Sequence, residues 1–102
     1  MKNNYALITG ASSGIGLESA RYIASKGINL ILTARRKELL SNISREISEE
    51  YNVHVDFFPC DLSDSDAPMQ IYDYCKSKKY KVNILVNNAG YGIPTSFDKT
   101  SM

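Results

Sequence analysis

Short continuous apolar runs alternate with longer segments of helical periodicity along this 102-residue chain. The runs are typical of strands buried on both faces, because no polar position interrupts them. The longer segments repeat apolar residues at the spacing of one helix face, which predicts amphipathic helices. The expected strands cover residues 5–9, 29–34, 53–58 and 82–86. The expected helices cover residues 15–25, 37–51 and 64–79.

Strands that alternate with helical crossovers predict an α/β domain with a parallel sheet covered on both faces. In a doubly wound arrangement, the four strands would lie in the order 3-2-1-4, joined by three crossover helices. We expect residues 1–102 to form this single domain. The residues expected to face the sheet include Ile15, Ala20, Ile23 and Ala24 in the first helix and Met69, Ile71, Tyr72 and Cys75 in the third.

Two features near the C-terminus predict that this domain is incomplete. Thr100 and Ser101 are helix-capping residue types, but the chain stops at Met102 without a helix to cap. The fourth strand would lie at an open sheet edge, and its apolar residues 84–86 lack the charge or proline that protects such edges. We therefore expect a domain truncated at its C-terminal side, in which copies of the chain could associate through the exposed fourth strand.

A glycine-rich segment, TGASSGIG at residues 9–16, lies directly between the first strand and the first helix. Gly10 would permit a tight turn, Gly14 the approach of a pyrophosphate, and Gly16 close packing of helix on strand. The helix N-terminus would offer its free N–H groups to the phosphates. The alternative is a turn that binds no ligand, but the strand before and the helix after favour binding. The predicted cofactor-binding residues of this segment are Gly10, Ser12, Ser13, Gly14, Ile15 and Gly16.

TGASSGIG resembles the TGxxxGxG motif of the short-chain dehydrogenases/reductases, and two further motifs match that family in order. Cys60-Asp61-Leu62 resembles its adenine-binding aspartate segment, and residues 87–90 read NNAG. This resemblance covers essentially the whole chain. It implies an incomplete Rossmann-type domain from an oxidoreductase that transfers hydride between a nicotinamide dinucleotide and a carbonyl or alcohol.

The resemblance also implies roles for individual residues. Asp61, with Leu62 beside it, would bind the adenine. Asn87, Asn88, Ala89 and Gly90 would line the ribose side of the cofactor, and Asn88 would also brace the central sheet.

The end of the second strand bears on the choice between NAD and NADP. An NAD site usually carries an acidic residue about 20 positions after the glycines, to bind the ribose 2′-hydroxyl. Here that region contains Arg35 and Arg36 and lacks an acid. Guanidinium groups suit a 2′-phosphate, so we predict NADP over NAD. The alternative is two solvated arginines at a helix start, where positive charge is slightly unfavourable.

The family's catalytic Tyr-x-x-x-Lys pattern occurs three times, at Tyr22/Lys26, Tyr72/Lys76 and Tyr74/Lys78. In the family this pair follows NNAG, whereas all three pairs here precede it. We therefore interpret them as neighbours on one helix face and assign no catalytic residue to this chain. A small carbonyl or alcohol substrate is expected only for a complete parent protein. A non-catalytic dinucleotide-binding module and an unstable gene fragment remain alternatives to the enzyme.

Composition excludes several other classes. With 12 basic and 11 acidic residues, the chain lacks the charge of a nucleic-acid-binding protein. Cys60 and Cys75 have no metal-ligand spacing and are expected to be reduced thiols, and His54 has no partner motif. The sequence contains neither a signal peptide nor an apolar stretch as long as a membrane span, which predicts a cytoplasmic protein without a membrane partner.

Overall fold

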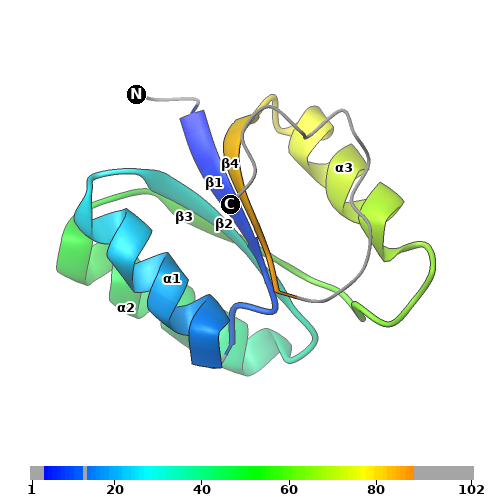
Figure 1. Cartoon of the computed structure of the whole chain (residues 1–102), viewed down its shortest axis with the longest axis horizontal. Coiled ribbons are helices and arrows are strands. Elements are labelled where there is room, and N and C mark those ends of the chain that lie inside the picture. The colour runs from blue at the N-terminus through cyan, green and yellow to red at the C-terminus, as the bar shows by residue number, and fades with distance from the viewer. Residues whose placement is uncertain (1–3, 13, 89–102) are drawn as a thin grey trace.

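The computed structural model describes residues 4–12 and 14–88, which form a parallel four-stranded sheet and three helices (Figure 1). The strands are β1 (Asn4–Thr9), β2 (Asn29–Ala34), β3 (Val55–Pro59) and β4 (Lys81–Asn87). The helices are α1 (Gly14–Ser25), α2 (Lys37–Tyr51) and α3 (Ala67–Ser77). The strand order β3-β2-β1-β4 confirms the predicted doubly wound arrangement.

The helices cover the two faces of the sheet unequally (Figure 1). Helices α1 and α2 lie on one face and α3 on the other, so the central strands β1 and β2 are enclosed on both sides. This enclosure explains the uninterrupted apolar runs, because alternate residues of each strand face opposite cores. The fully buried strand residues include Leu7, Ile8, Leu30, Ile31 and Leu32.

Two residues predicted to face the sheet are exposed instead. The Ile15 side chain is 74% exposed, and that of Met69 is 53% exposed. Ile15 lies in the first turn of α1, close to the end of β1, and among the described residues no neighbouring element covers its side chain there. In α3, Ala67, Ile71 and Cys75 are the buried residues, a narrower stripe than the sequence pattern predicted.

Element ends also differ from the prediction at α3. The helix begins at Ala67 and not at residue 64, because a turn occupies the residues between. The Asp64 side chain accepts a hydrogen bond from the Asp66 N–H at 3.0 Å, and the Asp64 carbonyl accepts one from Ala67 N–H at 3.0 Å. Pro68 then lies in the first turn, where a missing N–H has no cost.

A carboxylate in β3 joins α3 and the start of β4 to the sheet. Asp56 Oδ2 accepts hydrogen bonds from the hydroxyls of Tyr74 at 2.8 Å and Tyr80 at 2.5 Å. Its Oδ1 accepts one from the Phe57 N–H at 2.8 Å. The Tyr74 ring stacks on Phe58 with 4.6 Å between centroids. Burial raises the pKa of both phenols, and their hydrogen bonds to the Asp56 carboxylate raise it further.

These raised pKa values predict a loss of stability in alkali. The folded state favours the neutral phenols, so their contribution to stability is complete below the ordinary tyrosine pKa of about 10 and disappears as the pH rises above it. We expect the free energy of unfolding to fall above about pH 10, and Tyr80→Phe to make that fall less steep. Urea unfolding followed by circular dichroism at a series of pH values measures both effects. Tyr22→Phe, at an exposed tyrosine of α1, is the matched control and should keep the wild-type slope. Equal slopes for wild type and Tyr80→Phe would contradict the prediction.

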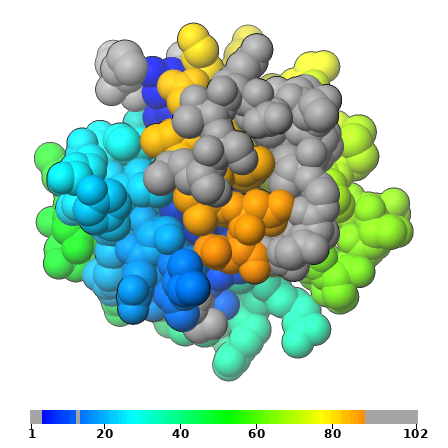
Figure 2. All heavy atoms as spheres, viewed as in Figure 1, coloured from blue at the N-terminus to red at the C-terminus, as the bar shows by residue number. Residues whose placement is uncertain are grey.

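Strand β4 lies at one edge of the sheet and pairs with β1. In the space-filling view, its atoms are visible between those of α1 and α3 (Figure 2). Association of copies through this strand stays a prediction. Within residues 4–12 and 14–88, none of the helices has the length and apolarity needed to cross a membrane.

Candidate functional site

The carboxyl ends of the four parallel strands meet at one edge of the sheet. Thr9 is in register with Thr33 on one side and with Asn87 on the other, and Ala34 is in register with Pro59. The segments that follow these strands are the glycine-rich segment, Arg35 and Arg36, the Asp61 loop, and Asn88. The sheet therefore brings together at one edge motifs that lie far apart in the sequence.

The glycine-rich segment makes a turn whose backbone favours glycine at two of its positions. Gly10 and Gly14 have φ angles of 63° and 60°, in the left-handed region. A Cβ atom on Gly16 would lie 2.2 Å from the Gly10 carbonyl oxygen, so the helix can approach the turn only without a side chain there. Helix α1 begins at Gly14 and has no acidic residue in its first turn. The first N–H groups of a helix have no intrahelical partner, so this helix start suits an anion.

A hollow of about 240 Å³ lies at this edge, and we call it the edge hollow. Three separate segments line it: the glycine turn, the end of β2 and the loop after β3. The lining residues are Gly10, Ser12, Ala34, Arg35, Asp61, Leu62 and Ser63. Five of these seven were predicted from the sequence as cofactor-binding residues. Ala34 and Ser63 were not, although Ser63 is only two positions from the predicted Asp61.

The two arginines lie in different places. Both are exposed, but Arg35 lines the edge hollow, whereas Arg36 is the N-cap residue of α2 and is absent from the lining. The sequence predicted the same role for both arginines, because a pattern of residue types does not show the direction of adjacent side chains at a strand end. A contact between Arg36 and a cofactor stays a prediction.

Asp61 lines this hollow, and Ser63 orients its exposed carboxylate. Its Oδ1 accepts hydrogen bonds from the Ser63 hydroxyl at 2.7 Å and from the Ser63 N–H at 3.0 Å. These two hydrogen bonds, followed by the positive charge of Arg35, hold the pKa of Asp61 below its usual range. The side chain is therefore ionised at neutral pH and can only accept hydrogen bonds.

Thr9 joins the ends of β1 and β4. Its buried hydroxyl lies 3.1 Å from Asn87 Oδ1, to which it donates, and accepts a hydrogen bond from the Asn88 N–H at 2.9 Å. The Asn88 side chain lies against Gly16, with its Nδ2 atom 3.0 Å from where a Cβ would stand. The bracing role of the Asn88 side chain stays a prediction. Thr9 was not among the residues predicted to bind the cofactor, although it is the first residue of the glycine motif. Ser13, Ala89 and Gly90, also predicted to bind the cofactor, lie outside the described residues.

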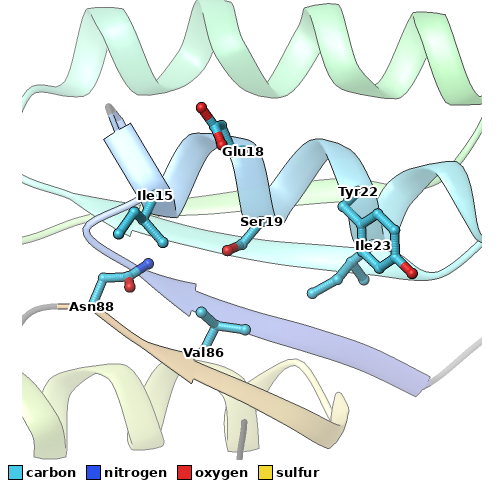
Figure 3. Close-up of a pocket in the computed structure, with 7 residues that line it drawn as sticks. All are labelled: Ile15, Glu18, Ser19, Tyr22, Ile23, Val86 and Asn88. Atoms are coloured by element: carbon cyan, nitrogen blue, oxygen red, sulfur yellow. The ribbon is translucent and has the colours of Figure 1, made fainter.

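A second hollow, of about 470 Å³, lies between α1 and β4 (Figure 3). Ile15 and Ile23 of α1 and Val86 of β4 surround it, with Asn88 near one end and Tyr22 near the other. The Ile15 side chain therefore lies apart from the edge hollow. A cofactor contact through the Ile15 backbone N–H stays a prediction.

The three Tyr-x-x-x-Lys pairs are neighbours on one helix face, as predicted. The lysine Nζ atoms lie 5.2 Å, 5.8 Å and 5.6 Å from the ring centroids in Tyr22/Lys26, Tyr72/Lys76 and Tyr74/Lys78. Such contacts are ordinary cation–π pairs on helix surfaces. None of these residues lines the edge hollow.

A parallel, doubly wound sheet with a glycine turn between β1 and α1 at its carboxyl edge defines the Rossmann-type class of folds. The family model described as short chain dehydrogenase matches residues 4–102. The chain therefore belongs to the short-chain dehydrogenase family, as its three sequence motifs predicted.

Several named proteins are similar to this chain. The fatty acyl-CoA reductase of Acinetobacter baylyi is 42% identical over 93 residues, which cover 91% of this chain and 31% of the relative. The very-long-chain 3-oxoacyl-CoA reductase of Vanderwaltozyma polyspora is 40% identical over 101 residues, or 95% of this chain and 28% of the relative. This chain thus spans about a third of the length of these relatives.

Solved structures show the same likeness. The L-sorbose reductase of Gluconobacter frateurii, solved with NADPH and L-sorbose, has a TM-score of 0.79 and 33% identity over 90% of this chain and 36% of its own. A short-chain dehydrogenase from Sphingobium yanoikuyae, solved with NADPH, has a TM-score of 0.76 and 34% identity over 87% of this chain and 35% of its own.

Proposed function

We propose that this chain is a single dinucleotide-binding domain that prefers NADP(H) and belongs to an oxidoreductase acting on a carbonyl or alcohol. The edge hollow is the observation that carries the proposal. Backbone suited to phosphate, a guanidinium group and an acceptor-only carboxylate line one hollow, although they come from three distant segments. These are the groups that the pyrophosphate, the ribose 2′-phosphate and the adenine of NADP(H) require.

The glycine turn fits the pyrophosphate. Gly10 and Gly14 allow the backbone to turn tightly, and Gly16 lets the start of α1 lie directly against the turn. The helix N-terminus then presents free N–H groups and a partial positive charge to the phosphates. In this proposal Ser12 and Ile15 contribute backbone donors from the same turn.

Arg35 supports NADP(H) over NAD(H). It lines the edge hollow at the end of β2, where an NAD site would have an acid. An arginine there can form charge-assisted hydrogen bonds with a 2′-phosphate but has no acceptor for the 2′-hydroxyl of NAD. Two similar structures were solved with NADPH, which supports the same preference.

When bound, the nicotinamide would supply the hydride donor or acceptor of the reaction. The residues of this chain would bind and orient the dinucleotide, with Asp61 on the adenine, Arg35 on the 2′-phosphate, and Asn87 and Asn88 near the ribose side. We assign neither the substrate nor the catalytic groups of the whole protein to residues of this chain.

Titration of the purified 102-residue chain with NADPH and NADH tests the proposal. A ligand that binds the folded state raises its melting temperature. We expect saturable stabilisation by NADPH and a dissociation constant for NADH that is at least about tenfold weaker. Nicotinamide fluorescence gives the two constants independently of the melting curves. Failure of both dinucleotides to bind would refute the proposed function, and equal affinity would refute the preference for NADP(H).

A further inference from the structure

The backbone of the loop that carries Asp61 is fixed at three points. The Cys60 N–H donates to the Ala34 carbonyl at 3.0 Å, and the Asp64 N–H donates to the Asp61 carbonyl at 3.0 Å. Leu62 packs against the apolar cluster between the sheet and α3. The freedom that remains to Asp61 is therefore rotation of its side chain.

Ser63 restricts that rotation. Its hydroxyl and its N–H both donate to Asp61 Oδ1, at 2.7 Å and 3.0 Å. Because both bonds use the same oxygen, Oδ2 remains as the acceptor for a ligand. Ser63 also lines the edge hollow, so the atom that orients Asp61 lies beside the space that a ligand would occupy.

Arg35 is a competing partner for the Asp61 carboxylate. It lines the same hollow, and its charge acts on Asp61. Within the described part of the chain, the salt bridges are those of Arg21 with Glu46 and Glu50, so Arg35 and Asp61 are not in contact. Without the Ser63 hydroxyl, the carboxylate would be freer to turn, either towards Arg35 or towards another donor on the ligand.

We propose that Ser63 is a positioning residue that makes Asp61 selective for a 6-aminopurine, an inference that rests on the proposed dinucleotide site. Adenine presents an amino group at position 6, which donates to a carboxylate. Hypoxanthine presents a carbonyl oxygen there and an N–H at the neighbouring position 1. A fixed carboxylate distinguishes the two bases, because it cannot shift to the neighbouring N–H. A carboxylate that turns freely can follow the donor and therefore distinguishes them poorly.

Binding of NADPH and of its hypoxanthine analogue to the 102-residue chain tests this role. We expect the wild type to bind NADPH about tenfold more tightly than the analogue, and Ser63→Ala to reduce that ratio to about twofold. Ser63→Thr keeps the hydroxyl and should restore the ratio. Ser65→Ala, at an exposed serine of the same loop, is the matched control and should leave the ratio unchanged.

The outcomes separate the two proposals. If the wild type binds neither dinucleotide, the proposed function is wrong and the role of Ser63 is refuted with it. If the wild type prefers NADPH and Ser63→Ala keeps the full preference, the role of Ser63 alone is refuted. A loss of affinity for both ligands by the same factor would also refute it, since that result indicates a structural role only.

Discussion

Gly16→Ala is expected to abolish binding of NADPH and to lower the free energy of unfolding by about 1–3 kcal/mol. The new Cβ would lie 2.2 Å from the carbonyl oxygen of Gly10 and 2.9 Å from its carbonyl carbon. Both are backbone atoms, so no side-chain rotation relieves the clash. Helix α1 would have to move away from the turn, and its N-terminal N–H groups would then leave the positions proposed for phosphate binding. Urea unfolding and NADPH titration measure the two effects.

Ser19→Ala is the matched control for this variant. It places the same side chain in the same helix, at a position that lines the second hollow and not the turn. We expect its stability and its affinity for NADPH to stay close to those of the wild type. Wild-type binding by Gly16→Ala would show that the turn tolerates a side chain, and the proposed close approach would then be wrong.

Arg35→Asp is expected to reverse the preference between the two dinucleotides. Loss of the guanidinium and addition of a negative charge should weaken binding of NADPH about 100-fold, because both changes act on the 2′-phosphate. The aspartate can accept a hydrogen bond from the 2′-hydroxyl of NADH, so affinity for NADH should rise. Dissociation constants for both ligands at two salt concentrations give the result, since screening weakens an exposed charge interaction.

Arg36→Asp provides the control, because it makes the same change of charge one residue away. Arg36 is exposed like Arg35 but does not line the edge hollow, so its replacement should alter the ratio of the two constants far less. Equal effects of the two substitutions would indicate a general electrostatic attraction and would contradict a specific role for Arg35.

The sequence predicted the fold well for identifiable reasons. The central strands are enclosed on both faces, and that environment requires uninterrupted apolar runs such as residues 30–32. The order β3-β2-β1-β4 is that of the doubly wound arrangement, which the alternation of strands and helices predicted. The burial predicted for Ile15 and Met69 was wrong, because it depends on where along the helix each residue lies. Helical periodicity gives the direction of a side chain but does not say whether a neighbouring element extends far enough to cover it.

Of the candidate site, the sequence by itself determined the glycines, Arg35 and Asp61. A glycine at a left-handed turn or at a close backbone contact cannot be replaced without strain. Such positions can therefore be recognised from the spacing of glycines in the sequence. Only the tertiary structure decided the rest. The register of β1 with β4 places the Thr9 hydroxyl against Asn87 and Asn88, and the turn after β3 places Ser63 on Asp61. The tertiary structure also places Arg35, but not Arg36, in the lining of the edge hollow. These relations depend on atoms brought together by strand pairing and loop conformation, and a linear pattern of residue types does not contain them.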